Sequence, residues 1–244
     1  MIVLDSISKK FGEKIILSQA SHTFRDGEIA SITAPNGTGK TTLLSIISGL
    51  LLPDEGNVVY GSRNGCRGVN IVLSGERNLY IKNTVQENLL YLGAIRGMSR
   101  KDIEMRIRQY QKYFPIIGQI SNSVIEKLSY GQKRLMAIFS AVISDADCVL
   151  LDEVTEGLDM EYIRMLRELL TNISENKVIL LASHDYDFVA GISQSVVFFK
   201  EGKLIEQRGH FNLEELKEKY MQIYGLEGIR KDAEGDILGN KDGY

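Results

Sequence analysis

The sequence lacks several features that would point to particular classes of protein. It has only two cysteines, Cys66 and Cys148, which lie far apart in 244 residues. No disulfide framework is therefore implied, and a reducing cytoplasm fits. No apolar run reaches about 18 residues, so the chain is not expected to span a membrane by itself. The first residues, "MIVLDSISKK", contain neither a long apolar run nor a cleavage site, so no signal peptide is expected.

An excess of positive charge is also missing. The chain has 29 Lys and Arg against 32 Asp and Glu, which gives a net charge of -3 and a pI near 5.7. Nucleic-acid-binding domains usually carry a basic face, so no nucleic-acid partner is expected. Apolar residues make up 43% of the chain, enough for a sizeable core in one large domain or two small ones.

The apolar patterning that is present predicts an α/β protein. Segments rich in Ile, Val and Thr, separated by turn-like stretches, predict strands over 2–8, 15–24 and 28–34 and in "DEGNVVYGS" and "VNIVLS". The continuous apolar run "CVLLDEV" is typical of a parallel strand buried on both faces, and "KVILLAS" is a further predicted strand. A hairpin is expected around "KEGK".

Helical spacing of apolar residues predicts the remaining elements. The predicted helices are two within 84–114, with Ser99 as a cap between them, and others over 129–146, 160–175, 185–192 and 212–225. The order of elements predicts one domain over 1–225, with a β-rich N-terminal part and a helical insert near 75–145. The glycine-rich, polar tail 226–244 is expected to be loosely packed.

The stretch "APNGTGKTT" at 34–42 follows a predicted strand and begins a predicted helix, the context of a phosphate-binding loop. The residues expected to turn backbone N–H groups inward as an anion nest are Asn36, Gly37, Thr38 and Gly39. Lys40 would bridge the β- and γ-phosphates, Thr41 would hold Mg²⁺, and Thr42 would reach the α-phosphate. Ala34 stands where such loops usually have glycine, but alanine accepts ordinary strand dihedrals.

Two further strand ends carry polar side chains. Asp152 and Glu153 follow an apolar strand, where a Mg²⁺ partner of the phosphate loop belongs. We expect Asp152 to hold the ion, and Glu153 to be the general base that orients the attacking water. His184 ends the next strand along the chain, so it is expected to contact the γ-phosphate.

Together these stretches resemble the ATP-binding cassette (ABC) family. "LSYGQ" at 128–132 is similar to the family's signature motif, with Tyr130 in a position that is often glycine. "EGLD" at 156–159 resembles the D-loop, and His184 resembles the switch histidine. Phe11 resembles the aromatic residue that stacks on adenine. The resemblance covers 2–225 and implies a P-loop NTPase (RecA-like) core with an antiparallel β subdomain and a helical signature subdomain.

The resemblance implies that two cassettes pair head to tail. Each ATP would lie between the phosphate loop of one chain and the signature loop of the other. On this basis Ser129, Gly131, Gln132 and Asp159 are candidate nucleotide-binding residues. The chemistry of two of these residues agrees with that role. Ser129 can cap the following helix, and Gly131 permits close approach of a phosphate. In "VLSGERNLY" at 72–80, Gly75 stands where the family's Q-loop has glutamine, and Glu76 is the nearest polar substitute.

The expected function is that of an ATP-hydrolysing subunit, paired as a homodimer or heterodimer, that drives a separate membrane permease from the inner face of the membrane. "SGERNLY…TVQENLLYL" is most similar to ATPase subunits of ABC-2-type exporters. A non-transport ABC assembly factor and a regulatory ATP clamp are the alternatives, and Glu153 and His184 argue against the clamp. The stretch 74–95 is the expected permease-docking surface; its exposed set would be Glu76, Arg77, Leu79, Tyr80, Ile81, Leu89, Leu90 and Tyr91.

Overall fold

The computed structural model describes residues 1–61, 68–75, 79–175 and 177–225. The expectations for Glu76, Arg77 and the tail 226–244 lie outside these residues. Among the described residues, no helix combines the length and apolarity needed to cross a bilayer.

Six strands form the larger sheet, in the order β5-β6-β7-β3-β8-β9. Neighbouring strands are parallel except β8 and β9, which form an antiparallel hairpin. The strands are β3 (Ile29–Thr33), β5 (Val69–Val72), β6 (Cys148–Asp152), β7 (Val178–Ala182), β8 (Ser195–Lys200) and β9 (Lys203–Arg208). Every residue of β3, β6 and β7 is buried, and the continuous apolar run predicted this for β6.

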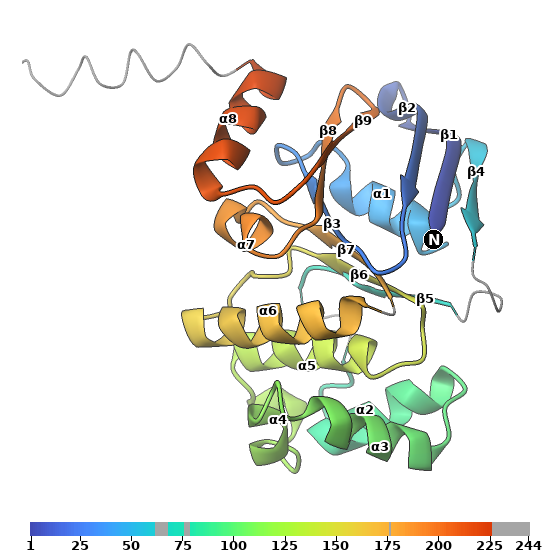
Figure 1. Ribbon diagram of the computed structural model, residues 1–244. Coiled ribbons are helices and arrows are strands. Elements are labelled where there is room, and N and C mark those ends of the chain that lie inside the picture. The colour runs from blue at the N-terminus through green and yellow to red at the C-terminus, as the bar shows by residue number, and fades with distance from the viewer. Residues whose placement is uncertain (62–67, 76–78, 176, 226–244) are drawn as a thin grey trace, which may run out of the picture.

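The two faces of this sheet pack into different hydrophobic clusters. Side chains alternate along a strand, so Val149 and Leu151 face one cluster while Cys148 and Leu150 face the other. The first cluster contains the helices α5 (Tyr130–Val142) and α6 (Met160–Ser174), which lie side by side below the sheet in Figure 1. The second contains α1 (Lys40–Ile47), on the opposite face.

A smaller antiparallel sheet covers α1 from the other side. Its order is β2-β1-β4, formed by β1 (Ile2–Phe11), β2 (Lys14–Phe24) and β4 (Glu55–Tyr60). Apolar residues of β1 and β2 share the second cluster with α1, so the helix is enclosed between two sheets. The expected fold, a P-loop NTPase core with an antiparallel β subdomain, is confirmed.

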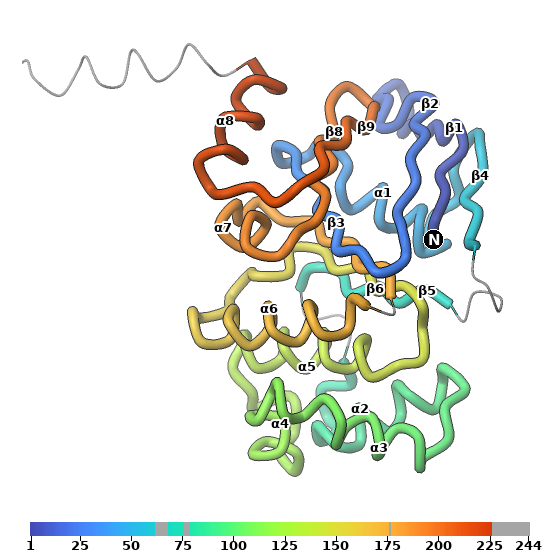
Figure 2. Tube along the Cα trace, viewed as in Figure 1, coloured from blue at the N-terminus to red at the C-terminus, as the bar shows by residue number. Residues whose placement is uncertain are grey.

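A helical layer lies beyond α5. Figure 2 shows the chain leaving β5, passing through α2, α3 and α4, and returning through α5 to β6. The helices are α2 (Val85–Ile95), α3 (Arg100–Tyr110) and α4 (Ile116–Gln119), followed by a 3₁₀ turn (Ile125–Lys127). Ser99 caps α3 as predicted, and Thr84 caps α2 with a capping box. The sequence reading missed α4 and the 3₁₀ turn, which are too short to show a helical period.

The surface predicted over 74–95 needs one correction. Leu89 is 2% exposed and belongs to the core, and Leu79 and Leu90 are half-buried against the same cluster. Tyr80, Ile81 and Tyr91 are the exposed members, with 47%, 45% and 45% of their surfaces accessible. The prediction had grouped these side chains because they lie in one stretch of sequence, which does not tell which of them meet the neighbouring layer.

The C-terminal elements return to the phosphate-loop strand. The short helix α7 (Tyr186–Ala190) follows β7, and α8 (Leu213–Tyr224) packs against α7 and β8. The Tyr224 hydroxyl lies 2.9 Å from the Phe199 carbonyl oxygen and 3.2 Å from that of Thr33. The last described helix is therefore fastened to the strand that leads into the loop at 34.

This topology decides where the polar side chains meet. Strands β6, β7 and β3 are adjacent and parallel, so their carboxyl ends share one edge of the sheet. Ligands of open α/β sheets bind at that edge. The loops that begin at Ala34, Asp152 and Ser183 converge there.

Candidate functional site

The loop after β3 is shaped by two glycines in the left-handed region. Gly37 has φ 74° and Gly39 has φ 118°. A Cβ on Gly39 would lie 2.3 Å from Cγ2 of Ile16, so both the backbone conformation and the packing require glycine there. Gly39 is the N-cap of α1, whose first turn adds unpaired N–H groups to the loop.

Lys40 begins α1 and is buried inside the loop, where its Nζ donates to the Ala34 carbonyl oxygen at 3.0 Å. Ala34 itself is buried and does not have a positive φ, so its methyl group is compatible with the loop. Thr38 donates its hydroxyl to the carbonyl of Pro35, which tightens the same turn. The loop therefore forms a concave set of donors with a cation at its base.

Thr41 and Asp152 form a pair suited to a hard cation. The Thr41 hydroxyl donates to Oδ2 of Asp152 at 2.7 Å. Asp152 is 1% exposed, and its Oδ1 is buried without a hydrogen-bond partner. Burial raises the pKa of this carboxyl, so a positive partner would relieve a real desolvation cost. Mg²⁺ is usually held by one or two carboxylates together with substrate phosphates, and these two residues fit it.

Glu153 occupies the centre of the site. Its Oε2 lies 2.7 Å from Nδ1 of His184, and its Oε1 lies 3.9 Å from Nζ of Lys40. Its backbone has φ 48°, an uncommon conformation for a residue with a Cβ. Such strain persists where surrounding contacts determine the geometry, and it concentrates at functional sites.

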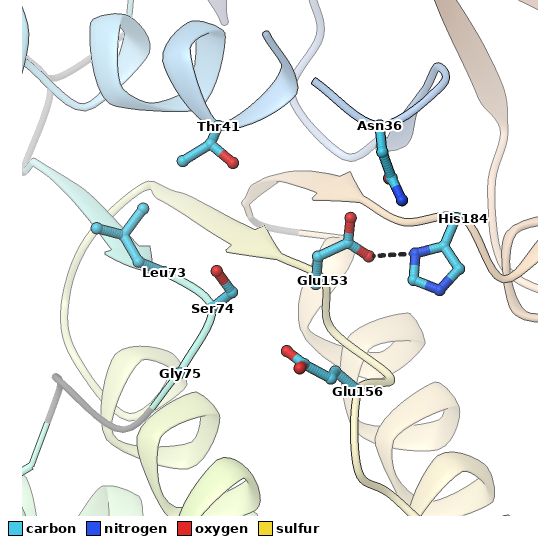
Figure 3. A pocket seen from close by; sticks show the side chains of 8 residues that line it. All are labelled: Asn36, Thr41, Leu73, Ser74, Gly75, Glu153, Glu156 and His184. Carbon is cyan, nitrogen blue, oxygen red and sulfur yellow. Dashed lines mark hydrogen bonds and ion pairs between the residues drawn. The ribbon is translucent and has the colours of Figure 1, made fainter. Parts of the chain in front are cut away.

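Thr41, Glu153 and His184 line one pocket of about 830 Å³. Figure 3 shows the Glu153 carboxylate pointing toward His184, with Asn36 next to His184 and Thr41 across the pocket. The lining residues are Asn36, Thr41, Leu73, Ser74, Gly75, Glu153, Glu156 and His184. Glu153 and His184, which were predicted to lie at strand ends, thus come together in one pocket. The sequence did not predict that Ser74 and Glu156 would also line it. Gly75, with φ 83°, contributes only backbone where the resemblance led us to look for a glutamine.

Phe11 lies outside this pocket, at the end of β1. Its ring is 52% exposed, with Nζ of Lys9 at 5.6 Å from the ring centroid. An exposed ring on a fixed strand can stack on a planar base. Thr42 is partly buried on α1, one residue beyond the Thr41 hydroxyl.

The signature stretch begins α5 and is also outside the pocket. The Ser129 side chain accepts from the Gln132 N–H, and the Gln132 side chain accepts from the Ser129 N–H, which is a capping box. Gly131 is buried, and a Cβ there would lie 2.8 Å from the Gly157 carbonyl oxygen. Packing within the chain is therefore one reason for glycine at 131. Asp159 caps α6 by accepting from the Tyr162 N–H at 2.8 Å.

One residue that the sequence reading missed links these two regions. Arg134 is 2% exposed, and its guanidinium donates to the backbone carbonyls of Leu73, Asp152 and Glu153. No sequence signal identifies such a residue, because its partners are backbone atoms of distant segments. Its neighbour Lys133 has the same charge but is more exposed.

Comparisons with known proteins agree with this geometry. The sequence model of a family described as "ABC transporter" matches residues 17–156. The ABC transporter ATP-binding protein NatA of Bacillus subtilis is 32% identical over 217 residues, covering 84% of this chain and 88% of NatA. The Nod factor export ATP-binding protein I of Rhizobium leguminosarum bv. viciae is 31% identical, covering 92% and 75%. The tungstate uptake system ATP-binding protein TupC of Peptoclostridium acidaminophilum is 30% identical, covering 86% and 99%.

Solved structures show the same fold. One described as the dimeric structure of a bacterial ABC transporter cassette is 26% identical, with a TM-score of 0.74 over 85% of this chain and 98% of that one. Another, described as the ATP-binding subunit of an ABC transporter, has a TM-score of 0.77 over 93% of this chain and 95% of that one, at 22% identity.

Proposed function

The chain belongs to the ABC transporter family of ATPases, and from that premise we propose that it pairs head to tail and powers export through a separate membrane permease. The observation that supports ATP hydrolysis by this chain is the position of Glu153. Its carboxylate lies between the Lys40 ammonium and the His184 ring, beside the loop that can cradle phosphates. That is where a base is needed to orient a water toward a γ-phosphate.

The chemistry assigns one task to each group. The N–H groups of the loop 36–41 and the Lys40 ammonium hold the phosphates and offset their charge. Glu153 orients the attacking water and accepts its proton, while the oxygen–phosphorus bond to ADP breaks. His184 holds Glu153 by its Nδ1 and can contact the γ-phosphate through its other nitrogen. Mg²⁺, held by Thr41 and Asp152, would supply Lewis-acid stabilisation of the phosphate charge.

Head-to-tail pairing is supported by what the two loops offer. The site around Lys40 has a cation, a base and a metal-ligand pair, and Ser129, Gly131 and Gln132 do not line it. Ser129 is exposed at the N-terminus of α5, whose dipole favours a negative group. A second chain that brings its own phosphate to Ser129 would use that end. The solved relative described as dimeric is consistent with such pairing.

The permease contact is proposed on α2 and the segment before it. Among the described residues there, the exposed large hydrophobic side chains are Tyr80, Ile81, Tyr91 and Ile95, and we call these four the docking patch. The rings of Tyr80 and Tyr91 pack edge to face at 4.6 Å, which makes the patch rigid. Exposed aromatic residues of this kind mark interaction surfaces. A short apolar helix of a membrane subunit is the proposed occupant, which would place this chain at the inner face of the membrane.

The substitution Glu153→Gln tests the proposed chemistry. It should retain ATP binding and reduce turnover by about 100-fold or more, because an amide cannot accept the proton. It should also trap an ATP-bound dimer. Phosphate release and light scattering with ATP and Mg²⁺ measure the two effects. Glu161→Gln, an exposed carboxylate in the first turn of α6 outside the pocket, is the control and should keep turnover within about threefold of wild type. Wild-type turnover in Glu153→Gln would refute the assignment.

The substitution Tyr80→Ala tests the docking patch. It should leave hydrolysis by the isolated chain within about twofold, because the side chain is exposed and outside the pocket, and should abolish most export by the reconstituted complex. Met105→Ala is the control, since Met105 is similarly exposed on α3 of the same helical layer. Normal export by the Tyr80→Ala complex would place the permease contact elsewhere.

A further inference from the structure

Arg134 is a buried cation that the proposed chemistry does not use. It lies in the second turn of α5, five residues after Ser129, and it is 2% exposed. Burial lowers the pKa of its guanidinium, so the group is held against a desolvation cost. A buried charge of this kind is retained only when its hydrogen bonds are strong and well placed.

The partners of Arg134 are three backbone carbonyls around the pocket. Nη1 donates to Leu73 at 2.7 Å, while Nη2 donates to Asp152 and, at 3.1 Å, to Glu153. Leu73 itself lines the pocket, Asp152 is the proposed metal ligand, and Glu153 is the proposed base. A single side chain of the signature helix thus ties two separate walls of the site.

The contact with Glu153 bears on its unusual backbone. Glu153 has φ 48°, and its peptide groups are held on both sides. Its N–H donates to the Ala182 carbonyl at 2.8 Å, and its own carbonyl accepts from Arg134 and from the Glu156 N–H, each at 3.1 Å. The Ala182 bond belongs to the sheet edge and the Glu156 bond to the local turn, whereas the Arg134 bond comes from α5. Without the Arg134 bond, only the local turn would hold this carbonyl, and the residue could relax to an ordinary φ and carry its carboxylate away from His184.

We propose that Arg134 is a positioning residue, which holds Glu153 in its left-handed conformation and couples the signature helix to the hydrolytic carboxylate. This inference depends on the proposed role of Glu153. Arg134 does not touch the reacting atoms; it acts through the backbone of Asp152 and Glu153. Its planar fork reaches carbonyls on two sides at once, which the compact ammonium of lysine does not do.

The substitution Arg134→Lys keeps the charge and tests the fork. We expect kcat to fall about 10- to 100-fold, because a small displacement of a catalytic group has effects of this size. The KM for ATP, and ATP binding measured by fluorescence, should change less than about threefold, because the loop 34–41 is untouched. Lys133→Met, the neighbouring position, is the control and should retain wild-type kcat. Thermal melting shows that each variant is folded.

A double substitution separates positioning from a general structural role. In the Glu153→Gln background, Arg134→Lys should change the residual turnover less than about twofold, since the group it positions is already gone. The ATP-bound dimer should still form. A fall by the same factor in both backgrounds, a rise in KM with unchanged kcat, or wild-type kcat in Arg134→Lys would each overturn the proposal.

The two ideas fail in distinguishable ways. If Glu153→Gln is inactive and Arg134→Lys is normal, only the positioning role is wrong. If Glu153→Gln turns over at the wild-type rate, the base assignment is wrong and the positioning role falls with it.

Discussion

The chain begins two helices with polar, glycine-containing loops, and the two loops are built in opposite ways. In the loop before α1, Gly37 and Gly39 take left-handed conformations, and no side chain caps the helix. In the loop before α5, Ser129 and Gln132 close a capping box with extended backbone. The first leaves its N–H groups free to surround an anion. The loop before α5 uses some of its own N–H groups in the capping box. It can therefore only add a contact to an anion that is held elsewhere.

Under the proposed head-to-tail pairing, this difference explains how one chain can carry two loops suited to phosphates without binding two nucleotides. The Lys40 loop has a cation, a metal-ligand pair and a base within reach. The Ser129 loop has an exposed hydroxyl and the end of a helix dipole. We interpret the Lys40 loop as a complete phosphate-binding site, and the Ser129 loop as a surface that covers the nucleotide bound to a partner chain.

Among the substitutions that test this difference between the two loops, Lys40→Ala is expected to have the largest effect. Nucleotide affinity should weaken about 10- to 100-fold, the size of a lost charge-assisted contact. Titration of the isolated chain with a fluorescent nucleotide measures it. Lys127→Ala removes an exposed lysine beside the second loop and should change affinity less than about twofold. Equal losses in both variants would mean that the two loops share one nucleotide within a chain.

A smaller but more selective effect is expected from Ser129→Arg. The exposed arginine should fill the space meant for the partner's phosphate, and so prevent ATP-driven pairing while monomer affinity stays within about threefold. Ser129→Ala is the control, because it removes the cap, worth about 1 kcal/mol, without adding bulk. Light scattering in the Glu153→Gln background reads out pairing. A loss of monomer affinity in Ser129→Arg would show that the loop acts within its own chain.

Mixing two variants sharpens that test. A Ser129→Arg chain keeps an intact Lys40 loop, and a Lys40→Ala chain keeps an intact Ser129 loop. The mixture should form at most one complete site, built from these two intact loops. Binding of two nucleotides per mixed dimer would contradict the head-to-tail arrangement.

The smallest effect is expected from Ala34→Gly. Ala34 is buried with an ordinary φ, so restoring glycine should change ATP affinity less than about twofold. Gly39→Ala, in the same loop, should by contrast change ATP affinity sharply. A Cβ there would lie 2.3 Å from Ile16, and the backbone has φ 118°. A sharp change in Ala34→Gly would show that the loop needs backbone freedom at its first position as well.

Local patterns in the sequence were enough to predict most of the fold. Strand-forming segments located β3, β6 and β7, and their position at one edge of an α/β sheet predicted that Asp152, Glu153 and His184 lie close together. Patterns could not predict contacts that depend on tertiary packing. Arg134 reaches carbonyls at 73, 152 and 153, and Leu89 turned inward where a surface residue was expected.

The position of β3 in the sheet also has a consequence for synthesis of the chain. β3 pairs with β7 on one side and β8 on the other, both made about 150 residues later, and Tyr224 then reaches its last carbonyl. During translation the phosphate loop therefore emerges well before the two strands that pair with β3. The loop that would hold the phosphates of ATP thus leaves the ribosome long before the strands that fix its position.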